Sequence, residues 1–303
     1  MRDADVIPFL RVIHDRPADD LPRLVFADFL EEHGDWRGPL MRRPAPASPL
    51  RDRAATAAWH SHLRNLHGVE WVACRRGLLS VIMPAAAVYE VPDSHLLKEA
   101  FRQGWVEHLD LVDNAGIPWA DQLDLQELPR LGFQRVDDET LENLPTMPSL
   151  RELYLNNCRA SRAELEWLND FPRLDALHIT WWHEASNTDL ARLLAAPHLK
   201  SLSIDGGNIS SAGLEQIARL RELRKLHVWG GQFTDAGLDA LRALDQLEEL
   251  KVSSRYLTDD ALPILARLPR LRILVLPTDC GETFSEAAMA DFHAARPDVV
   301  VSR

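Results

Sequence analysis

The chain has 303 residues, of which 46% are hydrophobic, and its 46 acidic and 34 basic side chains give a formal net charge of −12. This composition excludes a largely disordered chain, and a negative charge with no run of basic residues argues against binding to nucleic acid or to an anionic membrane. Three scattered cysteines, Cys74, Cys158 and Cys280, are too few for a disulfide framework or a zinc cluster.

The N-terminus carries charges at Arg2, Asp3 and Asp5, where a secretory signal peptide needs an apolar core. The longest apolar stretch, residues 77–92, is shorter than a helix that spans a bilayer and contains Pro84. We therefore expect a cytoplasmic protein.

Residues 1–35 predict two helices. In the first, apolar residues from Val6 to Ile13 follow helical spacing after Asp5, which we expect to be the cap. The second opens at Asp19–Asp20 and stops at Gly34. A proline-rich linker at about 39–49 and a third helix at roughly 50–67 follow.

Several segments of this part match a known pattern: Arg23-Leu24-Val25-Phe26-Ala27-Asp28-Phe29-Leu30-Glu31-Glu32-His33-Gly34-Asp35, Arg37-Gly38, His67-Gly68-Val69-Glu70-Trp71 and Arg75-Arg76-Gly77-Leu78-Leu79. They resemble the repeat-companion domain of certain bacteria, which leads into leucine-rich repeats. The resemblance implies a helical companion domain over residues 1–76, and it brings no enzymatic role with it.

Residues 77–105 predict an N-terminal cap for the part that follows. We expect a strand at 77–83 and a helix at about 85–103, because the first unit of a repeat array needs its apolar end covered.

The rest of the chain is repetitive. The pattern L-x-x-L-x-L begins at anchors that recur every 24 or 25 residues, and two shorter copies begin at Val106 and Leu128. The six regular anchors are Leu150, Leu174, Leu199, Leu223, Leu247 and Leu271. Each pattern predicts a strand whose inward residues alternate with outward ones.

A short helix is expected in the second half of each repeat. Three apolar stripes indicate it: Leu214/Ile217/Leu220, Leu238/Leu241/Leu244 and Leu262/Leu265/Leu268. Capping residues stand before these stripes, and their side-chain oxygens could accept from the first N–H groups of each helix. The caps are Ser210 or Ser211, Thr234 and Thr258.

These features resemble the leucine-rich-repeat family over residues 106–303. The predicted fold is α/β: a right-handed solenoid, or horseshoe, with a parallel concave sheet and convex helices, in eight units followed by a C-terminal strand at 298–302. The small α-helical domain precedes it. Only Asn114 and Cys158 occupy the position at which the family has a buried Asn or Cys, so the turns need other hydrogen bonds, and Gly207 and Gly231 are expected to ease the bend.

Candidate catalytic groups each have a plainer structural interpretation. His60, His62 and His67 lack the register of a metal site, and Cys158 with His178 fits a buried structural cysteine better than a nucleophile with its base. Asp28 is either a functional carboxylate or, as we prefer, the ion-pair partner of Arg23 or Arg37. We therefore predict no enzyme, no cofactor, no metal and no catalytic residue.

The concave face is the expected binding surface, since outward aromatic and histidine side chains gather in its middle repeats. The predicted partner-binding residues are Tyr154, Asn156, His178, Thr180, Trp181, Asp205, His227, Trp229 and Lys251. The neighbouring Trp182 is as consistent with burial as with exposure.

We expect a protein that is monomeric on its own and recognises a protein partner, for example as a regulatory or adaptor subunit of a bacterial multiprotein system. Two alternatives stay open. One is enzyme or effector activity in the N-terminal domain, and the other is a structural protein that assembles through the C-terminal strand Val299-Val300-Val301.

Overall fold

The computed structural model describes residues 3–43, 53–63, 69, 71–84, 95–112, 123–160, 165–182, 186–206, 208–276 and 284–302. The chain forms two compact units. The first comprises Met1–Gln134 and Asn143–Leu150, and the second comprises Arg135–Glu142 and Arg151–Arg303.

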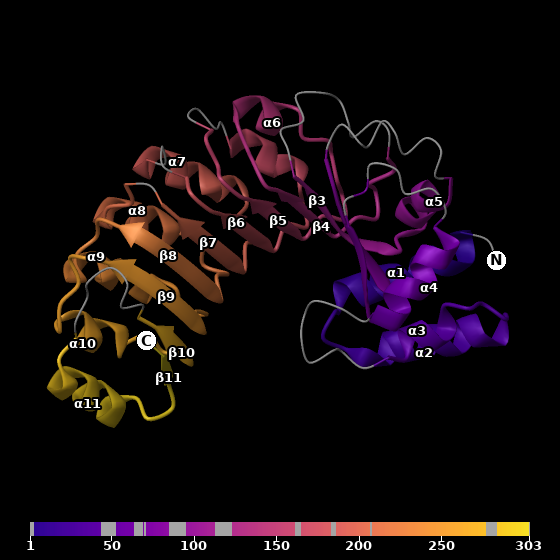
Figure 1. Ribbon diagram of the computed structural model, residues 1–303. Helices are drawn as coiled ribbons and strands as arrows, with labels where there is room; N and C mark the ends of the chain where they lie inside the picture. The colour runs from indigo at the N-terminus through magenta and orange to yellow at the C-terminus, as the bar shows by residue number, and fades with distance from the viewer. Residues whose placement is uncertain are drawn as a thin grey trace. The chain divides into compact units, whose positions relative to one another are not determined.

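The first unit combines helices with a sheet. Its helices are α1 (Asp3–Asp15), α2 (Asp20–Glu32), α3 (Gly38–Met41), α4 (Arg53–His62) and α5 (His95–Gln103), and its strands are β1 (Trp71–Arg75), β2 (Leu78–Met83), β3 (Val106–Leu111) and β4 (Arg130–Phe133). Strand β1 is antiparallel to β2, while β2, β3 and β4 run parallel. The helices and the first strands of this unit are indigo to magenta in Figure 1.

The N-terminal helices form where the sequence predicts them. Asp19 caps α2 by accepting from the Leu21 N–H at 3.0 Å, and Gly34 follows the helix with a φ of +68°, a left-handed conformation that glycine adopts without strain. Helix α1 already begins at Asp3, so Asp5 lies inside the helix rather than at its cap.

Two details of this region differ from expectation. Pro39 lies in the first turn of α3, where proline needs no N–H partner, so a helix occupies the start of the expected linker; residues 44–49 fall outside the described part. Strand β1 was not predicted, and it pairs along its whole length with β2, the expected capping strand.

The second unit repeats a strand followed by a helix. Its strands are β5 (Glu152–Leu155), β6 (Ala176–Ile179), β7 (Ser201–Asp205), β8 (Lys225–Gly231), β9 (Glu249–Ser254), β10 (Ile273–Val275) and β11 (Val300–Ser302). The helical segments are α6 (Asp138–Glu142), η4 (Leu165–Asp170), α7 (Asn187–Arg192), η5 (Leu193–Ala195), α8 (Ser211–Ile217), α9 (Asp235–Leu238), η6 (Asp239–Ala243), α10 (Ala261–Leu265) and α11 (Glu286–Ala295). Each strand from β5 to β11 pairs in parallel with the next in chain order, so this unit is a leucine-rich-repeat solenoid.

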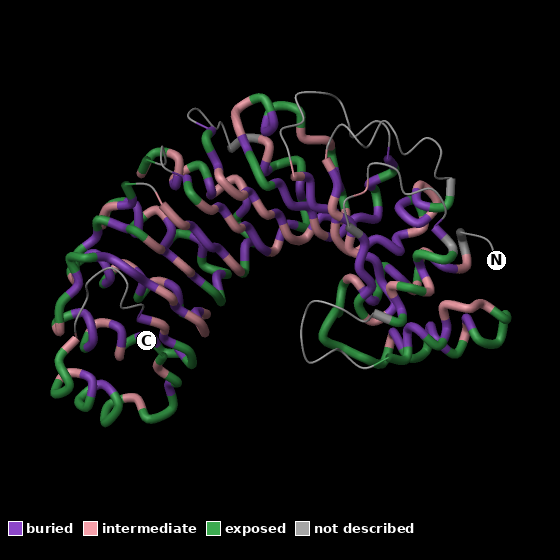
Figure 2. The backbone as a smooth tube through the Cα atoms, viewed as in Figure 1, coloured by how far each residue is buried: buried purple, intermediate pink, exposed green. Residues whose placement is uncertain are grey.

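The core of the second unit lies between the sheet and the helices, as the repeat pattern predicts (Figure 2). The inward strand residues Leu202, Leu226 and Leu250 are fully buried, and so are the helix residues Leu214 and Leu241 behind them. Because each repeat supplies only one strand and one short helix, this apolar layer is continuous only when neighbours stack.

The turns between strands and helices correct two expectations. Ser210 and Thr234 stand at helix N-caps but make no capping bond to their own helix, whereas Thr258 accepts from the Asp260 N–H at 3.3 Å. Gly206 and Gly230 adopt left-handed conformations, with φ of +92° and +74°, whereas Gly231 does not and Gly207 lies outside the described residues.

Candidate protein-recognition surface

The candidate site lies on one face of the second unit. Helices α7 to α10 cover one side of strands β5–β10, and we call the other side the concave face (Figure 1). Outward residues of neighbouring strands stand opposite one another there, because strand pairing follows the repeat length. One such row runs from Tyr154 through His178, Ser203 and His227 to Lys251.

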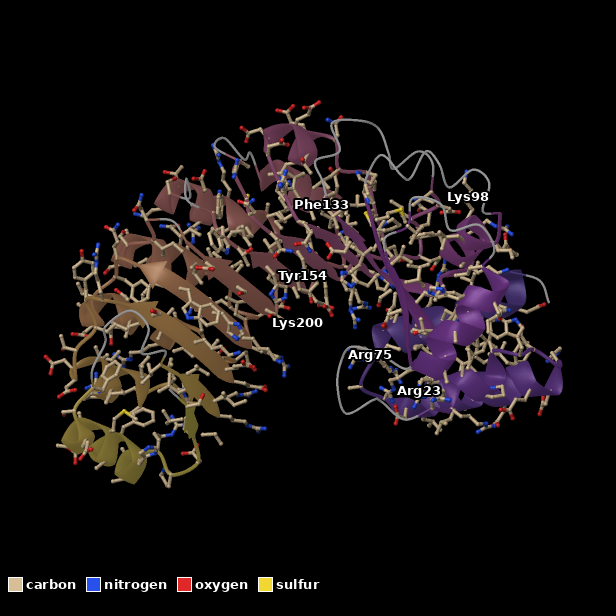
Figure 3. All side chains as sticks on the ribbon, viewed as in Figure 1. Arg23, Arg75, Lys98, Phe133, Tyr154 and Lys200 are labelled. Atoms are coloured by element: carbon tan, nitrogen blue, oxygen red, sulfur yellow. The ribbon has the colours of Figure 1, made fainter. Side chains whose placement is uncertain are left out.

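Tyr154 and His178 form the first part of this row. Their rings stack with centroids 4.5 Å apart and planes inclined by 5°, and Tyr154 is labelled in Figure 3. The Tyr154 hydroxyl donates to Glu152 at 2.7 Å. Both rings are half-buried, so each still presents surface to solvent while its neighbour fixes its orientation.

Asn156 and Thr180 directly follow the ends of the same two strands. The Thr180 hydroxyl donates to the Asn156 side-chain oxygen at 3.2 Å. The structure therefore brings together two predicted site residues, although part of their hydrogen-bonding capacity is used between themselves.

His227 and Trp229 form the second aromatic pair, on β8. Their ring centroids lie 5.9 Å apart at 64°, and Asp205 stands opposite Trp229 on the adjacent strand β7. His227 also lies opposite Lys251 on β9. Four of the nine predicted residues thus meet on three neighbouring strands.

Trp181 and Trp182 separate sharply. Trp182 is buried, with 1% of its surface exposed, and its indole N–H donates to the Ala160 carbonyl at 3.2 Å. Trp181 is 60% exposed and has a φ of +57°, an unfavourable conformation for a residue with a side chain. Trp181 therefore stands at the turn after β6, beside the row rather than in it.

Sequence reasoning passed over a charged residue that organises this face. The Glu249 carboxylate meets His227 Nε2 at 3.0 Å, Lys251 Nζ at 3.0 Å and Lys225 Nζ at 3.5 Å. The repeat spacing could have predicted this contact, because Lys225 and Glu249 are one repeat length apart and so stand opposite each other.

Burial and the neighbouring charges set the charge states of His178, His227 and Glu249. Burial lowers the pKa of both His178 and His227, and Lys251 lowers that of His227 further, while Glu152 and Glu249 act in the opposite direction. Burial alone would raise the pKa of Glu249, but hydrogen bonds from Lys251 and His227 outweigh it and hold that pKa low. At neutral pH the two imidazoles are therefore uncharged and Glu249 is ionised.

Of the groups considered for catalysis, His178 lies on the concave face, whereas Cys158 is buried and Asp28 belongs to the first unit. Burial raises the pKa of the Cys158 thiol to about 11, which opposes thiolate chemistry. Asp28 is exposed and pairs with Arg42, instead of the expected Arg23 or Arg37, because Arg23 bonds carbonyl oxygens near the end of α3 and Arg37 pairs with Asp35. Asp28 therefore takes part in a surface ion pair.

The three histidines weighed as metal ligands are His60, His62 and His67. His60 Nε2 lies 3.4 Å from the Val72 carbonyl, the His62 side chain is not described, and His67 and Cys280 fall outside the described residues. Within the described part of the chain, no three His, Cys, Asp or Glu side chains are placed to hold a metal ion.

No helix in the described part of the chain is both long and apolar enough to cross a bilayer.

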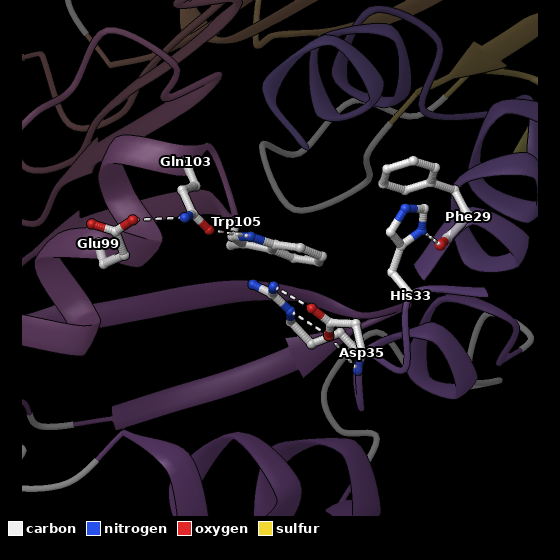
Figure 4. A network of polar contacts seen from close by, with 7 residues as sticks. Phe29, His33, Asp35, Glu99, Gln103 and Trp105 are labelled. Carbon is white, nitrogen blue, oxygen red and sulfur yellow. Dashed lines mark hydrogen bonds and ion pairs between the residues drawn. The ribbon is translucent and has the colours of Figure 1, made fainter. Parts of the chain in front are cut away.

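The first unit contains a cavity of about 250 Å³ that the sequence did not predict. Its walls include Trp36, Trp59 and Trp105, with Arg37 4.0 Å over the Trp105 ring. Figure 4 shows two contacts among its polar groups: Trp105 donates to Gln103, and Gln103 donates to Glu99. Arg37 also pairs with Asp35. These bonds engage polar groups of the cavity wall with one another.

Comparison with known proteins shows a likeness in fold. No protein-family model matches the sequence, and neither does any curated protein. Two solved structures from Listeria monocytogenes are similar: the internalin inlF, with a TM-score of 0.44 and 15% identity over 68% of this chain and 69% of that one, and internalin C2, with a TM-score of 0.38 and 19% identity over 57% of this chain and 69% of that one. Neither likeness bears on what this chain binds.

Proposed function

We propose that the chain is a non-catalytic recognition module that binds a protein partner on the concave face of its second unit. Its role would be that of a scaffold, such as a regulatory or adaptor subunit of a bacterial multiprotein system. The observation that carries this proposal is a set of ordered, half-buried rings, which we call the ring row: Tyr154, His178, His227 and Trp229.

Interface energetics favour such a row. Tyrosine and tryptophan side chains bury a large area on binding at a small cost in rotamer freedom, and they dominate hot spots of protein interfaces. Stacking of Tyr154 on His178 holds both rings in place before a partner arrives, which reduces the ordering cost of association.

Recognition and stability depend on side chains on opposite sides of the sheet. The leucines that hold the second unit together are fully buried on the opposite side of the sheet from these rings. Removing a ring from the concave face would therefore reduce the binding surface and leave the core intact.

The test is partner capture by purified full-length variants. Trp229→Ala and Tyr154→Ala should each weaken capture about thirtyfold, which corresponds to about 2 kcal/mol, with melting temperatures close to that of the parent. Arg242→Ala is the control, because Arg242 lies on η6, 50% exposed, in an ion pair with Asp239 on the helical side. The proposal fails if Arg242→Ala loses the partner and both concave variants keep it.

The alternatives give different results in the same preparation. An activity in the N-terminal domain would survive all three substitutions. Assembly through β11 would appear in light scattering as a concentration-dependent mass, and it would be sensitive to Val300, which is 67% exposed, rather than to Trp229.

A further inference from the structure

Four side chains on strands β8 and β9 form a compact charged group, which we call the lysine cluster: Lys225, His227, Glu249 and Lys251. Strand pairing places Lys225 opposite Glu249 and His227 opposite Lys251. The Glu249 carboxylate is the centre of the cluster, since the other three members all lie within 3.5 Å of it.

The cluster carries a net positive charge at neutral pH. Two ammonium groups outweigh one carboxylate, and His227 is uncharged because burial lowers its pKa. Each ammonium has three N–H donors, so the ion pairs with Glu249 leave donors on both lysines. Lys225 is 58% exposed and Lys251 is 27% exposed, which keeps those donors within reach of a ligand.

The Glu249 carboxylate, unlike the two lysines, has little hydrogen-bonding capacity left for a ligand. Glu249 already faces three donors and is itself only 14% exposed. An incoming cation would meet two lysines before it met this carboxylate, whereas an incoming anion would meet free ammonium donors. The cluster therefore selects for negative charge, in a protein whose overall charge is −12.

Apolar surface borders the cluster on two sides. Trp229 lies next to His227 on β8, and on β10 Ile273, which is 40% exposed, stands opposite Glu249. Val275 stands opposite Lys251. On the other side, β7 places the small residues Ser201 and Ser203 opposite Lys225 and His227, and Asp205 opposite Trp229. A ligand that suits this surface combines an anionic group with an apolar neighbour.

We propose that the lysine cluster binds the side-chain carboxylate of an aspartate or glutamate in a peptide segment of the partner, with apolar residues of that segment on its two sides, one against Trp229 and the other against Ile273. This assignment rests on the proposed function and names the chemistry of the partner at the same face. Within it, Lys251 and Lys225 contact the carboxylate, and Glu249 is a positioning residue that holds both lysines and limits their attraction.

The probe is a display library of short random peptides, selected on the full-length protein and then screened to discard peptides that bind Trp229→Ala equally well. The selected peptides should be rich in Asp or Glu next to aromatic or aliphatic residues. Binding of one synthetic peptide is then measured by fluorescence anisotropy, with the melting temperature of each variant recorded alongside.

The variants have matched controls. Lys251→Gln should weaken peptide binding about tenfold, while Lys200→Gln, which removes the same charge from a lysine paired with Asp175, should leave it unchanged (Lys200 is labelled in Figure 3). Glu249→Gln should tighten binding severalfold, because it removes the competing carboxylate and keeps the shape. A Glu249→Gln variant that binds more weakly would overturn the assignment.

The remaining outcomes are also decisive. Selected peptides without enrichment of Asp or Glu, or peptides that bind Lys251→Gln as well as the parent, would refute the carboxylate and leave the proposed binding face standing. If no selected peptide depends on Trp229, the proposed function itself fails and this assignment falls with it.

Discussion

The carboxylate of Asp235, at the start of α9, accepts hydrogen bonds from both the backbone N–H and the hydroxyl of Thr258 in the next repeat, at 2.9 and 2.8 Å. Asp259 binds Ser285 in the same way, at 2.8 and 2.6 Å. These bonds satisfy backbone donors between successive repeats. In the leucine-rich-repeat pattern a row of buried Asn side chains does this, and most repeats of this chain have no Asn at that position.

Replacing Asp235 should therefore loosen the contact between two repeats. We expect Asp235→Ala to lower the free energy of unfolding by about 1–2 kcal/mol, since the Thr258 N–H would lose a charge-assisted partner. Urea unfolding followed by circular dichroism measures it. Asp239→Ala is the control, because its pair with Arg242 is exposed and worth little. Equal losses in the two variants would contradict a ladder role.

The leucine core offers a more severe test of the fold. Leu226 is fully buried on β8, so Leu226→Ala should cost about 2–5 kcal/mol by leaving a cavity. The adjacent Lys225 points outward and is 58% exposed, so Lys225→Ala should change stability by less than about 0.5 kcal/mol. A Leu226→Ala variant that melts like the parent would show that the inward register is wrong.

The repeat pattern predicts this much of the structure because it constrains every residue twice. Leu226 must alternate with Lys225 along its strand, and it must also stand beside Leu202 and Leu250 on neighbouring strands. Only one register satisfies both, so the inward and outward faces follow from spacing alone.

Turns and side-chain contacts are less determined. In the pair Gly230–Gly231 the left-handed conformation falls on Gly230, with a φ of +74°, although glycine is equally able to adopt it at either position. The cavity walls Trp36, Trp59 and Trp105 come from distant parts of the chain with no common spacing, so no periodicity announces their meeting. The ion pair of Asp28 with Arg42 was not predicted for the same reason, because no regular spacing relates the two residues.

His14 should make the first unit sensitive to acid. Its Nε2 lies 2.8 Å from the Gly104 carbonyl, and burial lowers its pKa from an ordinary 6.5 to about 4. Between pH 6.5 and pH 4, His14 is therefore protonated in the unfolded chain and neutral in the folded chain. Stability contributed by the neutral ring is complete above pH 6.5 and falls by up to about 3 kcal/mol as the pH drops to 4.

The matched variant for this effect is His14→Gln, whose amide can still donate to Gly104 but does not titrate. Thermal melts at pH 7 and pH 4.5 should show a larger loss for the parent than for the variant. Identical losses would mean that other groups govern the acid response.

Trp181 combines an exposed indole with a strained backbone, and we expect function rather than stability to explain it. A φ of +57° costs an ordinary residue about 1–2 kcal/mol, which glycine avoids at an entropic cost of about 0.5–1 kcal/mol in the unfolded chain. Trp181→Gly should therefore leave the melting temperature unchanged or slightly raised. Loss of a 60% exposed indole beside the ring row should nevertheless weaken partner capture. Asn157→Gly makes the same backbone change at a φ of +47° without removing an aromatic ring, so it should keep full capture. If Trp181→Gly destabilises the chain and captures partner normally, the indole stabilises the fold and Trp181 is not part of the recognition surface.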